Sequence, residues 1–470
     1  MAKECRQLLA LIGISCDDST IIQGITCDSR EVKQDWLFVS LQGMSHNGDD
    51  FIDEVREKGG IVITSHPHPD CYEVSDPQAA LVTLINDYYD SPSDKLTIIG
   101  VTGTNGKTSV CSFLSQMFTE FGQRNVVIGT NGIQLDGYCY ATQNTTPGMM
   151  VCLRVFLEAI RRGIHTVMME VSSHAIDEGR LGFIRFDRLI YTNITQDHLD
   201  YHLTFTHYQY TKFKARLYLK ENGRILLNQD RDELMEMLHL RTKGIITYGL
   251  KPSHVQISNV ELRSSGSSFD IGQLHFETCL LSMNNVYNLA ACIALFKSLG
   301  IHSHELCEVV SRIEAPAGRM EVLKLKNHTI WIDYAHTPDA LRRLLEFANQ
   351  VCIGRIITVL GCGGERDQDK RHQMGTIAST LSYRAIFTED NSRGEDPAEI
   401  IKQMSVNVLD NVSVLIDRQK AIAFALSISM KSDIIIIAGK GNEQFLIVKE
   451  VKIPYNDKAF ILKLTEEEPL

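Results

Sequence analysis

The chain has 470 residues, of which 44% are hydrophobic and 22% are charged, and its formal net charge is −11. This acidic balance argues against a nucleic-acid-binding surface, and the longest apolar stretches, 96–101 and 433–439, have the length of a strand rather than of a membrane span. Residues 1–10 show no signal-peptide pattern, and the twelve cysteines are scattered without a C-x-x-C pair. We therefore expect a cytoplasmic protein with reduced thiols and a length that suits about three domains.

The first 93 residues have the pattern of a small mixed domain. Runs rich in β-branched and aromatic residues predict strands at 37–41 and 60–64, and the apolar periodicity of 81–89 predicts a helix. The turn-rich segment 90–94 then indicates a linker.

From residue 94 to residue 318, predicted strands and helices alternate. Strands are expected at 96–101, 126–129, 166–171 and 188–192, and helices at 110–121 and 151–162. Such alternation is typical of βαβ units, so we expect a mostly parallel sheet with ligand sites at the carboxyl ends of its strands.

Residues 319–470 have the pattern of a second α/β unit. The predicted strands are 329–333, 356–360, 385–388 and 434–438. Each strand runs into a polar or Gly-rich loop, as an α/β binding domain requires. The sequence therefore predicts an α/β protein with three domains, at 1–93, 94–318 and 319–470.

A Gly-rich heptapeptide follows the strand predicted at 96–101. A buried strand that ends in such a turn and continues into a helix directs several backbone N–H groups at one spot, where the helix N-terminus adds positive potential. In G-x-x-x-x-G-K-[ST] a lysine then reaches the terminal phosphates and a hydroxyl ligates Mg²⁺, although Val101 stands here in place of the first glycine. We predict an ATP site at Thr102, Gly103, Thr104, Asn105, Gly106, Lys107 and Thr108.

Two more polar loops follow predicted strands of the same sheet. They read E-V-S-S-H from Glu170 and T-N-I-T-Q-D-H from Thr192. Because the carboxyl ends of parallel strands meet at one edge, we expect Glu170 and His198 near the phosphate loop. A carboxylate and an imidazole there would complete the coordination of Mg²⁺, which accepts few protein ligands.

The chain resembles the ATP-dependent Mur ligases of peptidoglycan assembly. The similarity rests on six motifs, T-G-T-N-G-K-T, E-V-S-S-H-A, T-N-I-T-Q-D-H-L-D-Y-H, D-Y-A-H-T-P-D-A-L, G-C-G-G-E-R-D-Q-D-K-R and A-G-K-G-N-E. With D-S-R near residue 28, their order resembles that of the members that add the third residue of the peptide. The resemblance extends from about residue 24 to residue 445, nearly the whole chain.

The resemblance implies a monomeric ligase that uses ATP and Mg²⁺ to join meso-diaminopimelate to a UDP-N-acetylmuramoyl dipeptide. ATP would phosphorylate the free carboxylate of the dipeptide, and the amine would displace phosphate from the resulting acyl phosphate. The enzyme's contribution is to position the reactants and to neutralise phosphoryl charge.

The same resemblance implies residues for the nucleotide and the metal. Lys107 and Thr108 would hold the β- and γ-phosphates with one Mg²⁺, and Glu170 and His198 would complete the metal coordination. Further ATP contacts are implied for Asn288, Arg319, Asp333 and His336.

The family also carries a lysine carbamylated by CO₂, which turns a cation into a carboxylate that faces a metal. Counting without gaps from Ser172 puts this lysine at Lys212. Lys214 is a second candidate, because K-A-R-L-Y also resembles the family's K-x-x-L-F. A solvated helix lysine without modification is the usual alternative.

Substrate contacts are implied in the first two domains. Arg180 suits bidentate pairing with a carboxylate, whereas Glu178 stands where the family often has Gln and would repel an anionic substrate. The implied set is Ser29, Met44, Ser45, His46, Asn144, Thr145, Thr146, Ser172, Glu178 and Arg180.

The loop T-E-D-N-S-R-G-E-D-P resembles the D-N-P-R motif of members that add meso-diaminopimelate, with Ser392 in place of proline. Arginine suits a substrate with a distal carboxylate, and the lysine-adding members lack it. The implied amino-acid contacts are Arg366, Asp390, Asn391, Ser392, Arg393, Gly439 and Glu443, of which Glu443 would receive an ammonium.

Three alternatives stay open. Ser392, and Asn442 in place of the usual His of G-K-G-H-E, leave room for a ligase that adds another diamino acid such as L-lysine. A folylpolyglutamate synthase-like ligase would share the ATP loop and the modified lysine, but the D-S-R and D-N-S-R features argue against it. A non-catalytic nucleotide-binding paralogue is disfavoured by the intact Lys107, Glu170 and His198.

Overall fold

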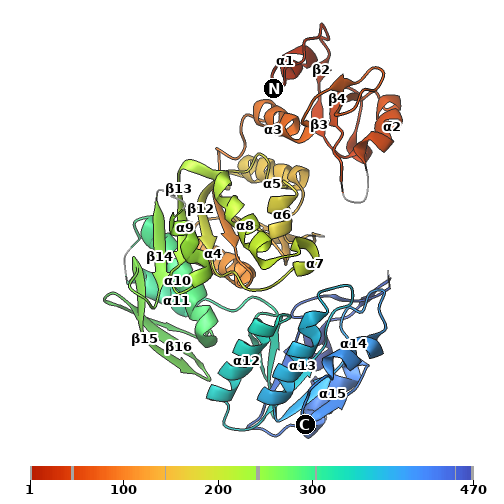
Figure 1. Ribbon diagram of the computed structural model, residues 1–470. Coiled ribbons are helices and arrows are strands. Elements are labelled where there is room, and N and C mark those ends of the chain that lie inside the picture. Colours follow the sequence, from red (N-terminus) through yellow and green to blue (C-terminus); the bar gives the residue numbers. More distant parts are fainter. Residues whose placement is uncertain are drawn as a thin grey trace. The chain divides into compact units, whose positions relative to one another are not determined.

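The computed structural model describes residues 3–43, 47–142, 144–239, 244–301, 304–449 and 451–466 (Figure 1). They divide into two compact units. The first is made of Met1–Val101, Phe121–Leu189 and Thr211–Ile225, and the second of Thr102–Glu120, Ile190–Tyr210 and Leu226–Leu470. In the described part of the chain, no helix is both long and apolar enough to cross a membrane.

The N-terminal part of the first unit is built on a small parallel sheet with strand order β3-β4-β5-β6. Phe38 and Val62 of this sheet pack on Ile52 and Val55 of the helix Ile52–Glu57. Successive side chains of a strand point to opposite faces, so Phe38 and Val62 belong to the apolar face of the sheet. The elements are β1 (Lys3–Glu4), α1 (Cys5–Ala10), β2 (Ile21–Ile22), β3 (Gly24–Thr26), η1 (Ser29–Glu31), β4 (Trp36–Val39), η2 (Gly48–Phe51), α2 (Ile52–Glu57), β5 (Ile61–Thr64), β6 (Tyr72–Glu73) and α3 (Pro77–Tyr88).

Strands β10-β9-β8-β11-β7-β12 lie side by side in this order within a larger sheet, which has eleven strands among the described residues. Strand β11 pairs in parallel with β7 and β8, with Met168 opposite Ile99 of β7 and Val127 of β8, whereas β9 pairs antiparallel with both β8 and β10. The bounds are β7 (Thr97–Thr102), β8 (Asn125–Gly129), β9 (Gly132–Leu135), β10 (Tyr138–Tyr140), α5 (Met149–Arg161), β11 (Thr166–Glu170), α6 (Ser173–Asp177) and β12 (Phe186–Tyr191).

The second unit contains the helix that follows the phosphate loop, α4 (Lys107–Glu120), and the long buried helix α10 (Ser282–Ser298), which pack together. The rings of Phe118 and Phe296 lie 4.8 Å apart between these helices. The remaining elements between β12 and α11, some of which belong to the first unit, are α7 (Leu199–His202), α8 (Phe205–Lys214), η3 (Ala215–Tyr218), β13 (Leu219–Asn228), α9 (Asp232–His239), β14 (Ile245–Gly249), β15 (Val255–Arg263), β16 (Gly266–Ile271), β17 (Leu274–Thr278) and α11 (Glu305–Ser311).

The C-terminal part of the second unit is a six-stranded sheet with the order β18-β19-β23-β20-β21-β22 and helices on both faces (Figure 1). Its elements are β18 (Glu321–Lys324), β19 (Thr329–Asp333), α12 (Pro338–Val351), β20 (Ile356–Leu360), α13 (Asp369–Leu381), β21 (Arg384–Phe387), α14 (Pro397–Met404), β22 (Val412–Val414), α15 (Arg418–Ile428), β23 (Ile434–Ala438) and α16 (Asp457–Glu466), with the hairpin of β24 (Phe445–Val448) and β25 (Val451–Pro454).

Alternate residues of the central strand β23 face opposite layers. Ile434 and Ile436 pack with α12, α13 and α14, whereas Ile435 and Ile437 pack with α15 and α16. A parallel strand covered on both faces is apolar along its whole length, which explains the run of four isoleucines. The predicted α/β fold class is confirmed, and the predicted strand segments appear as β4, β5, β7, β8, β11, β12, β19, β20, β21 and β23.

Candidate active site

The phosphate loop joins β7 to α4 and has glycine where the backbone demands it. Gly103 and Gly106 have φ angles of +148° and +90°. A Cβ on Gly103 would lie 1.9 Å from Thr192 Oγ1, and a Cβ on Gly106 would lie 2.7 Å from Asn288 Oδ1. Both positions therefore exclude larger side chains through conformation and through space.

The chain after β12 anchors this loop. The Thr192 hydroxyl donates to the Asn105 carbonyl at 2.6 Å, and the Asn193 amide both donates to that carbonyl at 3.1 Å and accepts from the Asn105 N–H at 3.0 Å. Thr104 is held in the same way, because its hydroxyl exchanges hydrogen bonds with the backbone of Thr195. The T-N-I-T segment thus fixes the loop before a ligand arrives.

Lys107 begins α4 and folds back over the loop. Its ammonium donates to the carbonyls of Gly103 and Thr104, both at 2.8 Å. The charge therefore lies beside the loop whose N–H groups and glycines were predicted to hold phosphate. This is where a lysine that contacts terminal phosphates has to be.

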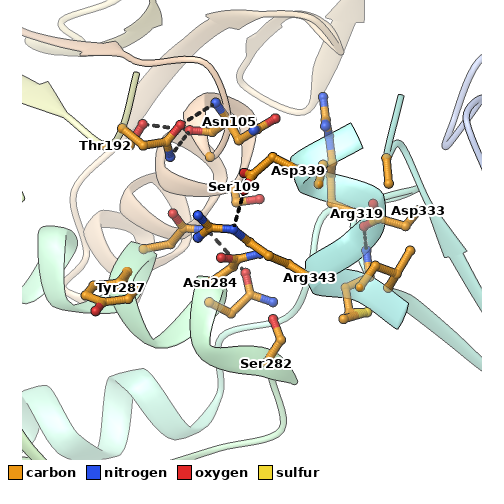
Figure 2. A pocket seen from close by; sticks show the side chains of 18 of the residues that line it. Asn105, Ser109, Thr192, Ser282, Asn284, Tyr287, Arg319, Asp333, Asp339 and Arg343 are labelled. Carbon is orange, nitrogen blue, oxygen red and sulfur yellow. Dashed lines mark hydrogen bonds and ion pairs between the residues drawn. The ribbon is translucent and has the colours of Figure 1, made fainter. Parts of the chain in front are cut away.

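A polar pocket opens beside the loop in the second unit (Figure 2). It brings together five of the predicted nucleotide contacts, Asn105, Gly106, Asn288, Arg319 and Asp333. Its wall also contains residues that the sequence did not single out, namely Ser109, Asn228, Arg231, Ser282, Asn284, Asn285, Tyr287, Asp339 and Arg343.

Arg319 connects this pocket to the start of α4. Its guanidinium lies over the ring of Tyr334, 4.3 Å from the centroid, and donates to Thr108 Oγ1 at 3.4 Å. Asp333 accepts from the N–H of Met320 at 2.7 Å, and burial raises the pKa of its carboxyl. Arg319 and Thr108, which come from distant segments, are therefore neighbours.

The imidazole rings of His198 and His336 both lie near the carboxylate of Asp197. Asp197 Oδ2 is 3.4 Å from His198 Nε2 and 4.0 Å from His336 Nε2. Burial lowers the pKa of His336 to about 4, and its Nδ1 is 2.8 Å from the carbonyl of Tyr334. Burial alone would raise the pKa of Asp197, but the charges of His198 and Lys370, among others, lower it to about 2. Asp197 is therefore ionised at neutral pH.

Glu170 closes strand β11 in the first unit and is 1% exposed. Its carboxylate accepts from the N–H of Thr130 at 2.8 Å and from the Thr130 hydroxyl at 3.1 Å. A Cβ on Gly129 would lie 2.2 Å from Glu170 Oε1, so glycine makes room for the carboxylate.

Lys212 and Lys214 differ sharply in environment. Lys212 is 1% exposed, whereas the side chain of Lys214 is 53% exposed and its ammonium lies 3.9 Å from Asp177. Lysine is almost never buried without a special reason, and conversion to a carbamate would remove its positive charge. The burial therefore favours Lys212 over Lys214.

The predicted peptide contacts of the first unit form a connected set. The Thr146 hydroxyl donates to the Glu170 carbonyl at 2.8 Å and accepts from the Ser172 N–H at 3.0 Å. Arg180 donates to the Thr146 carbonyl at 3.0 Å and pairs with Glu178 at 2.5 Å. The carboxylate of Glu178 thus neutralises Arg180 in this structure.

Ser29 lines a separate cavity of the first unit, between the Asp28–Glu31 turn and the start of α5. Arg154 pairs there with Glu31. Thr145 contacts the Thr130 hydroxyl at 3.1 Å, whereas Asn144 is exposed. The predicted contacts Met44, Ser45 and His46 lie outside the described residues.

The second pocket of the second unit gathers the predicted amino-acid contacts. Arg366, Asp390, Asn391, Arg393, Gly439 and Glu443 all line it, together with Asp197, His198, Asp200, Tyr334, His336, Gly363, Asp367 and Lys370. Apart from residues 197–200, which follow β12, these residues lie in the segments that follow β19, β20, β21 and β23, which meet at the carboxyl edge of the parallel sheet.

Two guanidinium groups approach each other in this pocket. Arg393 has a φ angle of +49°, and its Nη1 donates to the carbonyl of Gly364 at 2.7 Å. Burial, and next the positive charge of Arg366, lower the pKa of Arg393. Two neighbouring cations repel each other, so this part of the pocket is suited to an anionic group.

Acidic groups face the same pocket. Glu443 Oε2 accepts from Lys440 at 2.8 Å and from the amide of Asn391 at 2.7 Å, and Oε1 accepts from Tyr334 at 3.2 Å. Lys440 is fully buried and also lies 3.6 Å from Asp390. The pocket therefore presents cations and carboxylates together, as a zwitterionic ligand requires.

Ser392 does not line this pocket. It is 1% exposed, and among the described residues its hydroxyl oxygen has no hydrogen-bond partner. The serine that replaces proline in the family motif thus faces the interior.

Two protein-family models match the chain. Residues 101–296 match the Mur ligase middle domain, and residues 318–441 match the Mur ligase, glutamate ligase domain. A UDP-N-acetylmuramoyl-L-alanyl-D-glutamate--2,6-diaminopimelate ligase of Geobacillus thermodenitrificans is 34% identical over 459 residues, which cover 93% of this chain and 94% of that protein. The chain belongs to the Mur ligase family.

Other Mur ligases show the same likeness. The ligase of the same name from Aquifex aeolicus is 34% identical over 454 residues, covering 94% of this chain and 93% of that protein. A solved structure of a UDP-N-acetylmuramoyl-L-alanyl-D-glutamate--2,6-diaminopimelate ligase aligns with a TM-score of 0.71 at 26% identity over 99% of both chains. MurF of Thermotoga maritima in complex with ADP aligns with a TM-score of 0.64 at 17% identity, over 94% of this chain and 97% of that chain, and shares the fold. Like the other Mur ligases, this chain is an ATP-dependent ligase.

Several residues of this Mur ligase site were missed from the sequence. Asp197 stands in the T-N-I-T-Q-D-H motif, and Lys370 in G-C-G-G-E-R-D-Q-D-K-R, so both could have been found there. Lys440, which lies beside the second pocket, stands in A-G-K-G-N-E and could have been found there too, whereas no local pattern marks Arg231 and Arg343 of the first pocket.

Proposed function

We propose that this Mur ligase adds meso-2,6-diaminopimelate to UDP-N-acetylmuramoyl-L-alanyl-D-glutamate with the consumption of ATP. The pocket that holds Arg366 and Arg393 together with Glu443 carries the proposal. Diaminopimelate has two carboxylates and two ammonium groups, and a pocket with both charge types can pair with them. The names of the relatives that are about 34% identical support the same substrate.

In the proposed reaction, the free carboxylate of the dipeptide attacks the γ-phosphorus of ATP. The bond to the β-phosphate oxygen breaks, so that ADP leaves and an acyl phosphate forms. The unprotonated amine of diaminopimelate then attacks the acyl carbon, phosphate leaves, and the nitrogen loses a proton to solvent, which creates the amide. Such chemistry needs in-line positioning and charge neutralisation more than a covalent catalyst.

The phosphate loop and Lys107 are proposed to hold the β- and γ-phosphates. Because glycines 103 and 106 and the Thr192–Asn193 anchor fix the loop, little reorganisation is needed when a nucleotide binds. Asn288, Arg319, Asp333 and His336 are proposed as the further ATP contacts. Arg319 already contacts Thr108, and so brings a second positive charge to the start of α4.

The donor types of the residues assigned below suit Mg²⁺. Thr108 and Glu170 offer hard oxygen donors, and Glu170 is a buried carboxylate at a strand end. Among the described residues, no group of three or more His, Cys, Asp or Glu side chains forms a cage, and Mg²⁺ in phosphoryl-transfer sites needs few protein ligands. We assign Thr108, Glu170, His198 and a carbamylated Lys212 to hold it. When bound, the ion would neutralise phosphate charge.

The proposed domains are 1–93, 94–318 and 319–470, which would bind the UDP-sugar, ATP and the amino acid respectively. For the nucleotide sugar we assign Ser29 and 44–46, and for the peptide portion 144–146, Ser172 and Arg180. Glu178 is assigned to the same site, where it holds Arg180 until a substrate carboxylate competes for the guanidinium. We further propose that the protein is a cytoplasmic monomer, which light scattering and fractionation would test.

Phosphate release from ATP tests the function. Release should require both the UDP-muramoyl dipeptide and meso-diaminopimelate, and omission of either should reduce it to background. A UDP-muramoyl tripeptide should accumulate in equal amount and be seen by mass spectrometry. Equal turnover with L-lysine would refute the proposed substrate, and turnover without any amino acid would refute the ligation.

A further inference from the structure

Arg418 is a fully buried cation at an unusual place. It is the first residue of α15, where the helix dipole disfavours positive charge, and its side chain has no exposed surface. Burying a guanidinium is costly unless each donor finds a partner. The groups that bond to its guanidinium therefore indicate the role of Arg418.

Those contacts converge on the two loops of the amino-acid pocket. Nη1 donates to the Glu389 carbonyl at 3.3 Å, and Nη2 donates to the Ala438 carbonyl at 3.2 Å. Glu389 directly precedes Asp390–Arg393, and Ala438 directly precedes the loop from Gly439 to Glu443. One planar group thus bridges the backbones at the ends of β21 and β23.

The guanidinium is itself oriented by the C-terminal helix. Nε and Nη2 donate to the two oxygens of Asp457, each at 2.8 Å, and Asp457 also accepts from the Tyr455 hydroxyl at 2.9 Å. Asp457 begins α16, which packs on the sheet through Ile461. Although burial opposes ionisation, Lys440 and Arg418 lower the pKa of Asp390, so the bridge also acts on the charge of the loop.

We infer that Arg418 is a positioning residue for the amino-acid site, because it sets the spacing between the loop of Asp390 and Arg393 and the loop of Glu443. Glu443 and Arg393 must be the right distance apart to pair with the ammonium and the carboxylate of one substrate. The inference rests on the proposed function, since it concerns the site that would bind diaminopimelate.

The opposite end of the same sheet offers a matched control. Arg355 pairs with Asp433 at 2.6 Å and donates to the Ile428 carbonyl at 3.1 Å, near the amino ends of β20 and β23. Like Arg418 it pairs with an aspartate and a main-chain carbonyl, but it touches neither loop and its side chain is 28% exposed. Arg355→Lys therefore reports what loss of an Arg–Asp pair does to the sheet alone.

The experiment compares Arg418→Lys with Arg355→Lys in the full chain, and adds Asp457→Asn. Thermal unfolding measures folding, and steady-state kinetics measure the KM of each substrate. We expect Arg418→Lys to raise the KM for diaminopimelate about tenfold or more with the KM for ATP within about twofold, Asp457→Asn to raise it less, and Arg355→Lys to change neither.

Three outcomes would overturn the inference. The first is an equal KM for diaminopimelate in Arg418→Lys and Arg355→Lys. The second is an equal rise of the KM for ATP and the KM for diaminopimelate in Arg418→Lys. The third is failure of both Arg418→Lys and Asp457→Asn to fold. If the wild-type enzyme itself does not ligate diaminopimelate, the proposed function fails instead, and the two failures are told apart by that first assay.

Discussion

The nucleotide pocket and the amino-acid pocket are built by different means. The phosphate loop is shaped by backbone conformation, with glycines at positive φ and a network of hydrogen bonds to main-chain groups. The second pocket is shaped more by charged side chains, because Lys440 donates to Glu443 and the guanidinium of Arg393 is held by the Gly364 carbonyl. We propose that the first binds a polyphosphate and that the second is a charge pattern suited to one class of amino acid.

This difference predicts different effects of substitutions in the two pockets. Substitutions in the phosphate loop should abolish phosphoryl transfer whichever amino acid is supplied. Changes in the charge pattern should alter the KM for the amino acid and leave ATP binding largely intact.

Loss of the phosphate-loop lysine should have the largest effect. Lys107→Ala removes the ammonium from the terminal phosphates and should lower kcat by about 10³-fold, as loss of a transition-state donor does. Lys95→Ala, which removes an exposed lysine paired with Asp90, should leave the rate unchanged. Phosphate release measures both variants, and a fall of less than tenfold for Lys107→Ala would mean that the loop does not act on the phosphoryl group.

Substitutions of the two lysines of α8, Lys212 and Lys214, should differ almost as much in their effect on activity. Lys212→Ala should abolish activity and short carboxylates should partly restore it, because they would replace the carbamate of a buried lysine. Lys214→Ala should be close to wild type, since Lys214 is half exposed. Activity with and without added acetate or formate tests the pair, and the reverse result would show that the modified residue is Lys214.

Substitution of one arginine in each pocket should raise the KM of a different substrate. Arg393→Ala should raise the KM for diaminopimelate by about 5- to 150-fold, which corresponds to about 1–3 kcal/mol for one unpaired charged group. Arg343→Ala, in the wall of the nucleotide pocket, should raise the KM for ATP instead (Figure 2). Parallel changes in both KM values for either variant would contradict the separation.

The smallest effect concerns the sheet beneath the amino-acid pocket. Although burial opposes it, the hydrogen bonds from Arg355 lower the pKa of Asp433 below 3.8. A carboxylate with a lowered folded-state pKa stabilises the fold at neutral pH and loses that contribution as the pH falls below 3.8.

Asp433→Asn should therefore lower the free energy of unfolding at pH 7 by about 1–3 kcal/mol, and the difference from wild type should shrink below pH 4. Urea unfolding at several pH values measures it. Kinetic constants at pH 7 should not change, because Asp433 lies at the amino ends of the strands. A deficit that stays constant down to pH 2 would mean that the charge of Asp433 is not what stabilises the sheet.

Much of the fold was predictable because the strands are short apolar runs between turn signals. The four isoleucines of β23 and the loops after β7 and β21 could be located from the sequence alone. The phosphate loop was predictable for the same reason, since its glycines, lysine and threonine are consecutive.

The pairings within the charge network could not be predicted, because the partners are far apart in the chain. Lys440 meets Asn391 across 49 positions, and Arg418 meets Asp457 across 39. Periodicity and local motifs describe neighbours within a few residues, whereas these pairs depend on which strand ends the sheet topology brings together. The burial of Ser392 was equally hidden, since a serine in a polar loop is expected to face water.

Competition between two amino acids tests the central claim most directly. Wild-type enzyme with ATP, the UDP-muramoyl dipeptide and equal concentrations of meso-diaminopimelate and L-lysine should form the diaminopimelate product in large excess, by about 5- to 150-fold if the arginine pair discriminates as one charged group would. Equal amounts of both tripeptide products, or an excess of the lysine product, would contradict the account.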